Sequence, residues 1–178
     1  MSCNIPVLTA HYSLVTKISF PREILPLSMV ALTFIDYLIA WGIFILLGMV
    51  YHLPVSAAVL WSIPLSLLLI LFTLALSLIA SCLNVFYRDL QLASNFFIQL
   101  LFFVSPVFYS AAHISPPFKN LLRLNPLTFI IENFRLCLLE GKPVDVYPFL
   151  IVLASLLILL ALSYNLFKRV EKKFADVI

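Results

Sequence analysis

The sequence predicts an all-α fold: a polytopic bundle of transmembrane helices with a re-entrant helical hairpin at the extracytoplasmic face. Of its 178 residues, 63% are hydrophobic and 11% are charged. An average soluble domain is about 45–50% apolar and about 25% charged. The apolar residues also gather in runs long enough to cross a hydrocarbon core of about 30 Å, which takes roughly 20 helical residues. We therefore expect an integral membrane protein.

Four apolar runs predict four spans, at about residues 27–50, 57–83, 92–108 and 147–167. The first run contains one charge, Asp36, and the second contains none. Pro64 either kinks the second span or marks its first turn. The third run is dense in phenylalanine, and Pro148 opens the fourth. Short connections join the first three spans.

The stretch from Ser105 to Glu140 is too polar for a span and too apolar for an ordinary loop. It holds four prolines and five charged residues, together with two short apolar pieces. Apolar segments of about 10–14 residues are more often re-entrant or interfacial than spanning. We expect residues 109–140 to form a re-entrant hairpin. Irregular backbone at membrane depth is tolerated only when it is buried or lines a cavity, so the hairpin indicates a gated pathway.

Four spans place both ends of the chain on one side of the membrane. If both ends are cytoplasmic, seven of the eleven basic residues face the cytoplasm, including those of the tail, residues 168–178. The other four lie in or beside the long hairpin, where translocated charges count less. The positive-inside rule therefore predicts a multi-pass membrane protein with both ends cytoplasmic. The first 20 residues have no features of a cleavable signal, so the first apolar run is expected to be the anchor.

Catalytic, metal and nucleotide motifs are not visible. The three histidines have no metal-ligand spacing, the three cysteines are interpreted as small apolar filler, and three glycines cannot build a phosphate loop. We expect a protein that is not an enzyme and holds no metal or cofactor. The net charge of +3 is small, and the basic residues lie near the ends of the spans. This placement is typical of membrane topology and not of a nucleic-acid-binding surface.

Several polar and aromatic residues allow two interpretations. Asp36 either makes a structural hydrogen bond near Thr33 and Tyr37 or faces a helix interface or pathway. Phe96 and Phe103 share a helical face that packs against other helices, faces lipid or lines a path on which sugar rings stack.

The roles of several residues outside the spans are also left open by the sequence. Glu132 and Arg135 are three residues apart, which suits an intrahelical pair or a plain surface pair. Tyr109 lies where an interfacial aromatic belt is expected. The segment from Lys17 to Glu23 either docks onto a soluble partner or lies at the lipid headgroups.

Five motifs occur in order between the apolar runs: KISFPREILPLS, NVFYRDL, SPVFYS, LNPLTFIIENFR and FKRVEKKFADVI. In this order and spacing, from about Leu14 to Ile178, the chain resembles the permease subunit of ABC-2 polysaccharide exporters. These are the export permeases for O-antigen, capsule and teichoic acid.

The resemblance implies six spans preceded by an amphipathic cytoplasmic helix. It also implies two permease copies, a homodimer, paired with two ATPase subunits that carry ATP and Mg²⁺. The substrate would be a lipid-linked polysaccharide crossing the bacterial inner membrane. Compared with the family pattern, residues 1–178 are expected to be a partial, N-terminally truncated transmembrane domain without the amphipathic helix and the first two spans.

The resemblance and the positions above assign residues to four roles. An ATPase-coupling segment, residues 14–25, contains Lys17, Phe20, Pro21, Arg22 and Glu23. A cytoplasmic turn contains Tyr87, Arg88 and Asp89. The periplasmic gate contains Ser105, Pro106, Tyr109, Asn125, Pro126, Glu132 and Arg135. Candidates for lining the channel are Asp36, Phe96 and Phe103.

Other functions stay open on the sequence. One is an ABC-2 permease for drugs or lipids, which neighbouring genes would distinguish. Another is a non-transporting fragment or assembly subunit. A third is a membrane-embedded transferase acting on polyprenyl-linked sugars, for which Arg123, Glu132 and Arg135 are the only candidates and form no recognisable set.

Overall fold

The computed structural model describes residues 24–51, 56–86, 90–109, 122 and 125–171. The elements are α3 (Ile24–Val50), the 3-10 helix η2 (Ala57–Trp61), α4 (Ser62–Phe86), α5 (Leu90–Val104), α7 (Pro126–Leu139) and α8 (Val146–Glu171). Over these ranges the chain contains helices and no strand. The predicted all-α class is confirmed.

Three helical stretches are long and apolar enough to cross a membrane: Pro26–Val50, Ala57–Asn84 and Val146–Val170. They coincide with the first, second and last predicted spans. The third predicted span, residues 92–108, corresponds to the shorter helix α5, which ends at Val104. Its 15 residues reach about 22 Å at 1.5 Å per residue, less than a hydrocarbon core of about 30 Å. Proline at 106 disfavours helical backbone at Ser105, which explains the early end.

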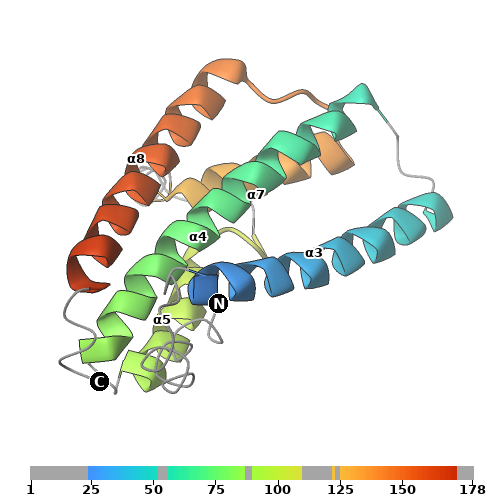
Figure 1. The fold of residues 1–178 in the computed structure, drawn as a ribbon. Coiled ribbons are helices and arrows are strands. Elements are labelled where there is room, and N and C mark those ends of the chain that lie inside the picture. The colour runs from blue at the N-terminus through green and yellow to red at the C-terminus, as the bar shows by residue number, and fades with distance from the viewer. Residues whose placement is uncertain (1–23, 52–55, 87–89, 110–121, 123–124, 172–178) are drawn as a thin grey trace.

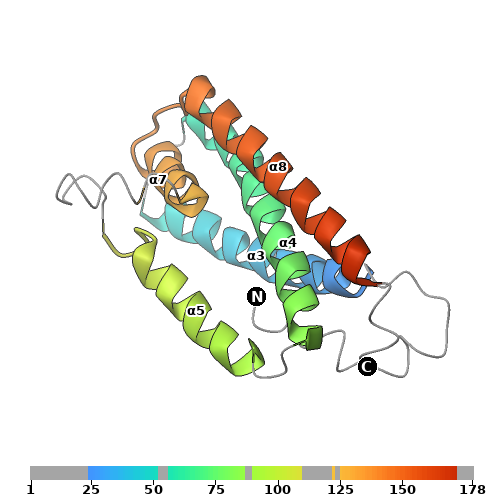
Figure 2. The ribbon, with the colours of Figure 1, turned by 90° about the vertical axis from the view of Figure 1, so that its left-hand side faces the viewer.

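Helices α4 and α8 lie side by side along their lengths and form the centre of the structure (Figures 1 and 2). They run in the same direction, because Leu65 and Leu68 near the start of α4 share a core cluster with Leu156 of α8. Further along, Cys82 packs with Phe167. Close packing of these side chains holds the two helices together, since lipid tails are as apolar as the side chains and burial alone gives little driving force in a membrane.

Helix α3 runs back against α4 and contacts it along one stripe. Every third or fourth residue on this stripe is partly or fully buried: Val30, Phe34, Tyr37, Trp41 and Phe44. The opposite face is apolar and exposed, with Leu32, Ile39 and Ile43 each more than half accessible.

The end of α7 lies beside the start of α4, on the side of the structure where α3 ends and α8 begins (Figure 1). Gly141, just after α7, has a φ of 64°, and a Cβ at this position would lie 3.2 Å from Ser56 Cβ. The connections before α4 and before α8 therefore touch. Helix α5 runs apart from α4 and α8 in Figure 2, and its far end approaches α7.

Helix α7 makes up most of the described part of the predicted hairpin, residues 109–140. Its 14 residues reach only about 21 Å, too short to span. Residues 110–121 and 123–124 lie outside the described residues, so the re-entrant form of the whole hairpin stays a prediction.

Candidate functional site

The turn that follows α5 is built around Pro106. The Ser105 N–H donates to the Leu101 carbonyl at 2.9 Å, which completes the last helical hydrogen bond. The Val107 N–H then donates to the Ser105 carbonyl at 2.7 Å and forms a tight turn. The last carbonyls of a helix have no partner within the helix, so this broken end needs donors from elsewhere.

Tyr109 supplies the first of these donors. Its hydroxyl lies 2.9 Å from the Val104 carbonyl and 3.2 Å from the Phe103 carbonyl. The ring therefore folds back over the end of α5. The hydroxyl of Tyr109 thus caps the end of α5. The interfacial position expected for this residue stays a prediction.

Arg135 of α7 supplies the other donors. Its Nη1 donates to the Tyr109 carbonyl at 3.2 Å. Its Nη2 donates to the carbonyls of Pro106 and Val107 at 3.3 and 3.2 Å. A guanidinium can hold several carbonyls at once because its N–H groups form a rigid planar fork.

The predicted intrahelical pair of Glu132 and Arg135 does not form. Among the described residues, the salt bridge present joins Lys142 to Glu140, at 2.8 Å and largely exposed. Arg135 binds instead the carbonyls of the turn that follows α5, where its bonds to Pro106 and Val107 are part-buried. Glu132 lies on α7 outside these contacts.

Asn125 makes a second connection between the same two segments. Its Nδ2 donates to Ser105 Oγ at 3.2 Å, and Ser105 is 2% exposed. Its Oδ1 accepts the Leu127 N–H at 3.0 Å and caps α7, and Pro126 occupies the first turn. One amide therefore both starts α7 and holds it to the end of α5.

We call this arrangement the α5–α7 clasp: the turn from Ser105 to Tyr109 with Asn125 and Arg135. The structure brings together six residues that sequence reasoning named as the gate: Ser105, Pro106, Tyr109, Asn125, Pro126 and Arg135. The clasp gives the irregular backbone of residues 105–109 hydrogen-bond partners from within the protein, which is what irregular backbone needs where lipid replaces water.

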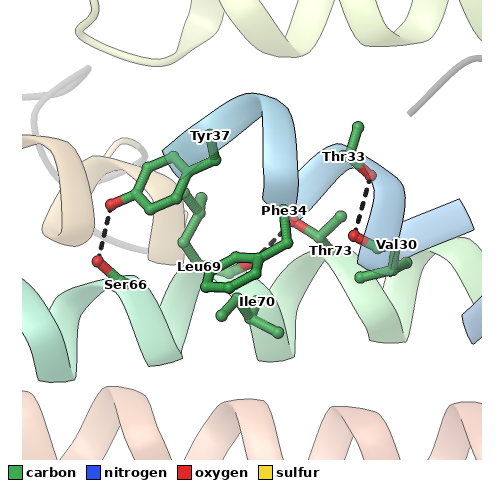
Figure 3. Close-up of a pocket in the computed structure, with 8 residues that line it drawn as sticks. All are labelled: Val30, Thr33, Phe34, Tyr37, Ser66, Leu69, Ile70 and Thr73. Carbon is green, nitrogen blue, oxygen red and sulfur yellow. Dashed lines mark hydrogen bonds between the residues drawn. The ribbon is translucent and has the colours of Figure 1, made fainter. Parts of the chain in front are cut away.

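A second polar cluster, between α3 and α4, was not predicted. The Trp41 indole N–H donates to the Tyr37 hydroxyl, which is hydrogen-bonded to Ser66 Oγ at 2.7 Å, and Ser66 donates to the Ser62 carbonyl at 2.6 Å. In this order each hydroxyl donates once and accepts once. Figure 3 shows Tyr37 against Ser66 beside a cavity of about 90 Å³ between the two helices. The spacing of Tyr37, Trp41 and Phe44 by three or four residues was the available sequence signal.

The structure places the channel-lining candidates at the surface. Asp36 is exposed on α3. Thr33 and Tyr37 do not bond it: Thr33 donates to the carbonyls of Met29 and Val30, and Tyr37 bonds Ser66. Phe96 and Phe103 of α5 are 63% and 60% exposed, so neither is core packing in this chain.

Two predicted groups fall outside the described residues. These are the ATPase-coupling residues Lys17, Phe20, Pro21, Arg22 and Glu23, and the cytoplasmic turn Tyr87, Arg88 and Asp89. Their roles stay predictions.

Three apolar helices of spanning length, with a clasped pair of shorter helices at one side, define a multi-pass α-helical membrane protein. Residues 7–139 match the family described as ABC-2 type transporter, and the chain belongs to this family. The predicted resemblance is therefore confirmed.

Relatives in two organisms extend the match along almost the whole chain. A protein of Klebsiella pneumoniae named O-antigen export system permease protein RfbA is 28% identical over 170 residues, 95% of this chain. A protein of Myxococcus xanthus with the same name is 30% identical over 168 residues, 93% of this chain. The chain spans 65% and 64% of the lengths of these two relatives.

Proposed function

We propose that this chain is the membrane-embedded permease part of an ABC exporter that moves lipid-linked polysaccharide outward across the bacterial inner membrane. A separate ATPase subunit, with ATP and Mg²⁺, would supply the energy. The observation that carries the proposal is the match of 93–95% of this chain to relatives named O-antigen export system permease protein.

The α5–α7 clasp supports a gate in this exporter. Its contacts are hydrogen bonds of about 3.2 Å, from side chains to carbonyls or to a hydroxyl. Each such bond contributes only about 0.5–1.5 kcal/mol net, or about 1.5–3 kcal/mol from a charged donor, because water can replace the partner. Opening such a contact toward an aqueous path needs no cavity in a packed core. We propose that ATP binding closes the ATPase pair, pushes on the coupling segments of residues 14–25, and parts α5 from α7.

The polymer path in this proposal runs along the exposed faces of α5 and α3. Phe96 and Phe103 offer aromatic faces on which sugar rings stack, and Asp36 offers a carboxylate that accepts hydrogen bonds from sugar hydroxyls. An isolated carboxylate facing lipid would be costly, which favours a water-filled path beside Asp36. The second permease copy would form the other wall.

Export in cells tests the proposal. Deleting the gene in a strain without a paralogue should stop surface display of the polymer, and the wild-type gene should restore it. The permease should also co-purify with an ATPase and raise its rate of ATP hydrolysis. Unimpaired display after deletion would contradict the proposal, and loss of drug or lipid export alone would favour an ABC-2 permease of another specificity.

Membrane topology is tested separately. A reporter fused after Ile178 should be active only in its cytoplasmic form, and a reporter inserted between residues 110 and 121 only in its periplasmic form. A periplasmic Ile178 would contradict the proposed topology without affecting the assignment of the chain to its family.

A further inference from the structure

Helix α3 touches α7 through two aromatic rings. The ring centroids of Trp41 and Phe134 are 6.3 Å apart, with the planes tilted by 55°. This lies within the range of favourable aromatic pairs. Phe134 directly precedes Arg135, whose guanidinium holds three carbonyls of the clasp. The ring contact and the clasp therefore belong to the same turn of α7.

Trp41 is fixed from the α3 and α4 side. Its indole N–H is held by Tyr37, which is tied to Ser66 of α4. Its ring also meets Phe44 of α3 edge-on, at 5.8 Å and 74°. A hydrogen-bonded, ring-packed indole moves with α3, so a displacement of α3 displaces the surface on which Phe134 rests.

Around this contact the two helices are not interlocked. A groove of about 280 Å³ lies between α3, α4 and α7, and its walls include Trp41, Phe44, Phe134 and Leu138. Space of this size beside a single ring pair lets α7 shift against α3 without forcing side chains into one another.

Helix α3 includes the last two residues of the segment 14–25, to which the proposed function gives contact with the ATPase, and it runs unbroken from Ile24 to Val50. Trp41 lies 17 residues after Ile24, a distance of about 26 Å along the helix. A continuous helix of this kind transmits a push at its start to its far half.

We propose that the Trp41–Phe134 contact transmits movement of α3 to α7 and so to the clasp, with Trp41 as a positioning residue for the gate. The inference rests on the proposed function. It adds the connection between the energy-receiving segment and the exit, which neither the family nor its relatives' names supply.

The test uses the complex of permease and ATPase in lipid nanodiscs and proteoliposomes. The chain has two tryptophans, so Trp61→Phe leaves Trp41 as its only indole. The emission spectrum of a W41F/W61F complex gives the contribution of the ATPase, which is subtracted. A non-hydrolysable ATP analogue should shift the emission of Trp41. Adding Phe134→Ala should abolish that shift.

Export per ATP hydrolysed is the second measurement. We expect Phe134→Ala to lower this ratio about fivefold or more, the lower range of coupling between linked sites, while the rate of ATP hydrolysis changes little. Phe134→Tyr keeps the ring and should restore the ratio. Phe44→Ala is the matched control, because it also removes a ring from Trp41 but leaves the Tyr37 hydrogen bond that fixes the indole and the contact between α3 and α7.

Equal losses in F134A and F44A, or an unchanged ratio in F134A, would overturn the inference. If F134A does not accumulate in the membrane, Phe134→Leu takes its place, because leucine retains apolar bulk without a ring. A wild-type complex that hydrolyses ATP but exports no polymer would instead overturn the proposed function, so the two failures are distinguishable.

Discussion

Arg135 donates to the backbone carbonyl of Pro106 at 3.3 Å, across 29 positions of the sequence. Pro106 has no N–H of its own and ends α5 early, which leaves carbonyls without helical partners. The arginine therefore compensates for a break that the proline creates. The two residue types are linked by this geometry: a proline opens the backbone, and a multi-donor cation on the neighbouring helix closes it.

Arg135→Ala is expected to lower the free energy of unfolding by about 1–3 kcal/mol, because three carbonyls, two of them in part-buried hydrogen bonds, lose a charged donor. Arg135→Lys should recover only part of this, since an ammonium lacks the planar fork. Thermal unfolding in detergent, followed by loss of helical circular dichroism, measures both variants. Glu132→Gln is the control, one turn away on the same helix and not paired with Arg135. An R135A midpoint equal to that of wild type would disprove the role of the clasp in stability.

The Asn125 side chain caps α7 and also binds Ser105, and substitutions at the two residues distinguish these two contributions. Ser105→Ala removes only the acceptor for Asn125 Nδ2 and should cost about 0.5–1.5 kcal/mol. Asn125→Ala also removes the cap of α7 and should cost about 1 kcal/mol more. The double variant should then be no less stable than N125A, because both changes remove the same bond. Additive losses in the unfolding midpoints would mean that the Asn125–Ser105 bond contributes nothing.

Sequence reasoning reached the stretch that holds the clasp because prolines and charges are unusual between apolar runs. The resemblance to the exporter permeases then supplied Ser105, Pro106, Asn125 and Pro126 as gate residues. Prolines, an asparagine before a proline, and an arginine mark a broken helix even without a structure. What it missed was the partner of Arg135. Glu132 is a charge at helical spacing and is the obvious partner, but backbone carbonyls freed 29 positions away leave no trace in the sequence.

The Trp41–Phe134 contact was harder to predict for a similar reason. The aromatic spacing on α3 indicates a packed stripe, but it does not tell which helix packs there. Only the fold brings α7 to that stripe. Span ends were also beyond reach: the apolar pattern continues to Phe108, whereas the helix stops at Val104 because the backbone at Ser105 responds to the following proline.

Cys137 offers a reporter of movement at α7. Its side chain is fully buried, and burial raises the pKa of the thiol. Since the thiolate is the reactive form, Cys137 should react slowly with a maleimide at neutral pH, and faster as the pH rises beyond the range in which an ordinary thiol ionises. If α7 moves during export, ATP should speed labelling of the C3A/C82A variant.

The control for that experiment is the C3A/C137A variant, which keeps only Cys82. This residue is buried to the same degree, between α4 and α8. The proposed gate does not move it, so its slow labelling should not respond to ATP. Equal acceleration at both cysteines would indicate general loosening of the bundle, and no acceleration at Cys137 would argue against opening at α7.

Two glycines make a matched pair for the connection after α7. Gly141 has a φ of 64°, and a Cβ there would lie 3.2 Å from Ser56 Cβ, whereas a Cβ at Gly42 in α3 would meet nothing within 4 Å. Gly141→Ala should therefore destabilise the chain by about 1–2 kcal/mol, the cost of the left-handed conformation for a residue with a side chain. Gly42→Ala should be neutral or stabilising by up to about 1 kcal/mol, because alanine favours a helix.

Unfolding midpoints of the two variants in the same detergent give the comparison. Because Gly141 holds α7 beside the start of α4, G141A should also loosen α7 and raise the labelling rate of Cys137 without ATP. G42A should leave that rate unchanged. An equal effect of both substitutions would mean that the positive φ and the approach to Ser56 do not fix the position of α7, and the clasp alone would then have to hold it.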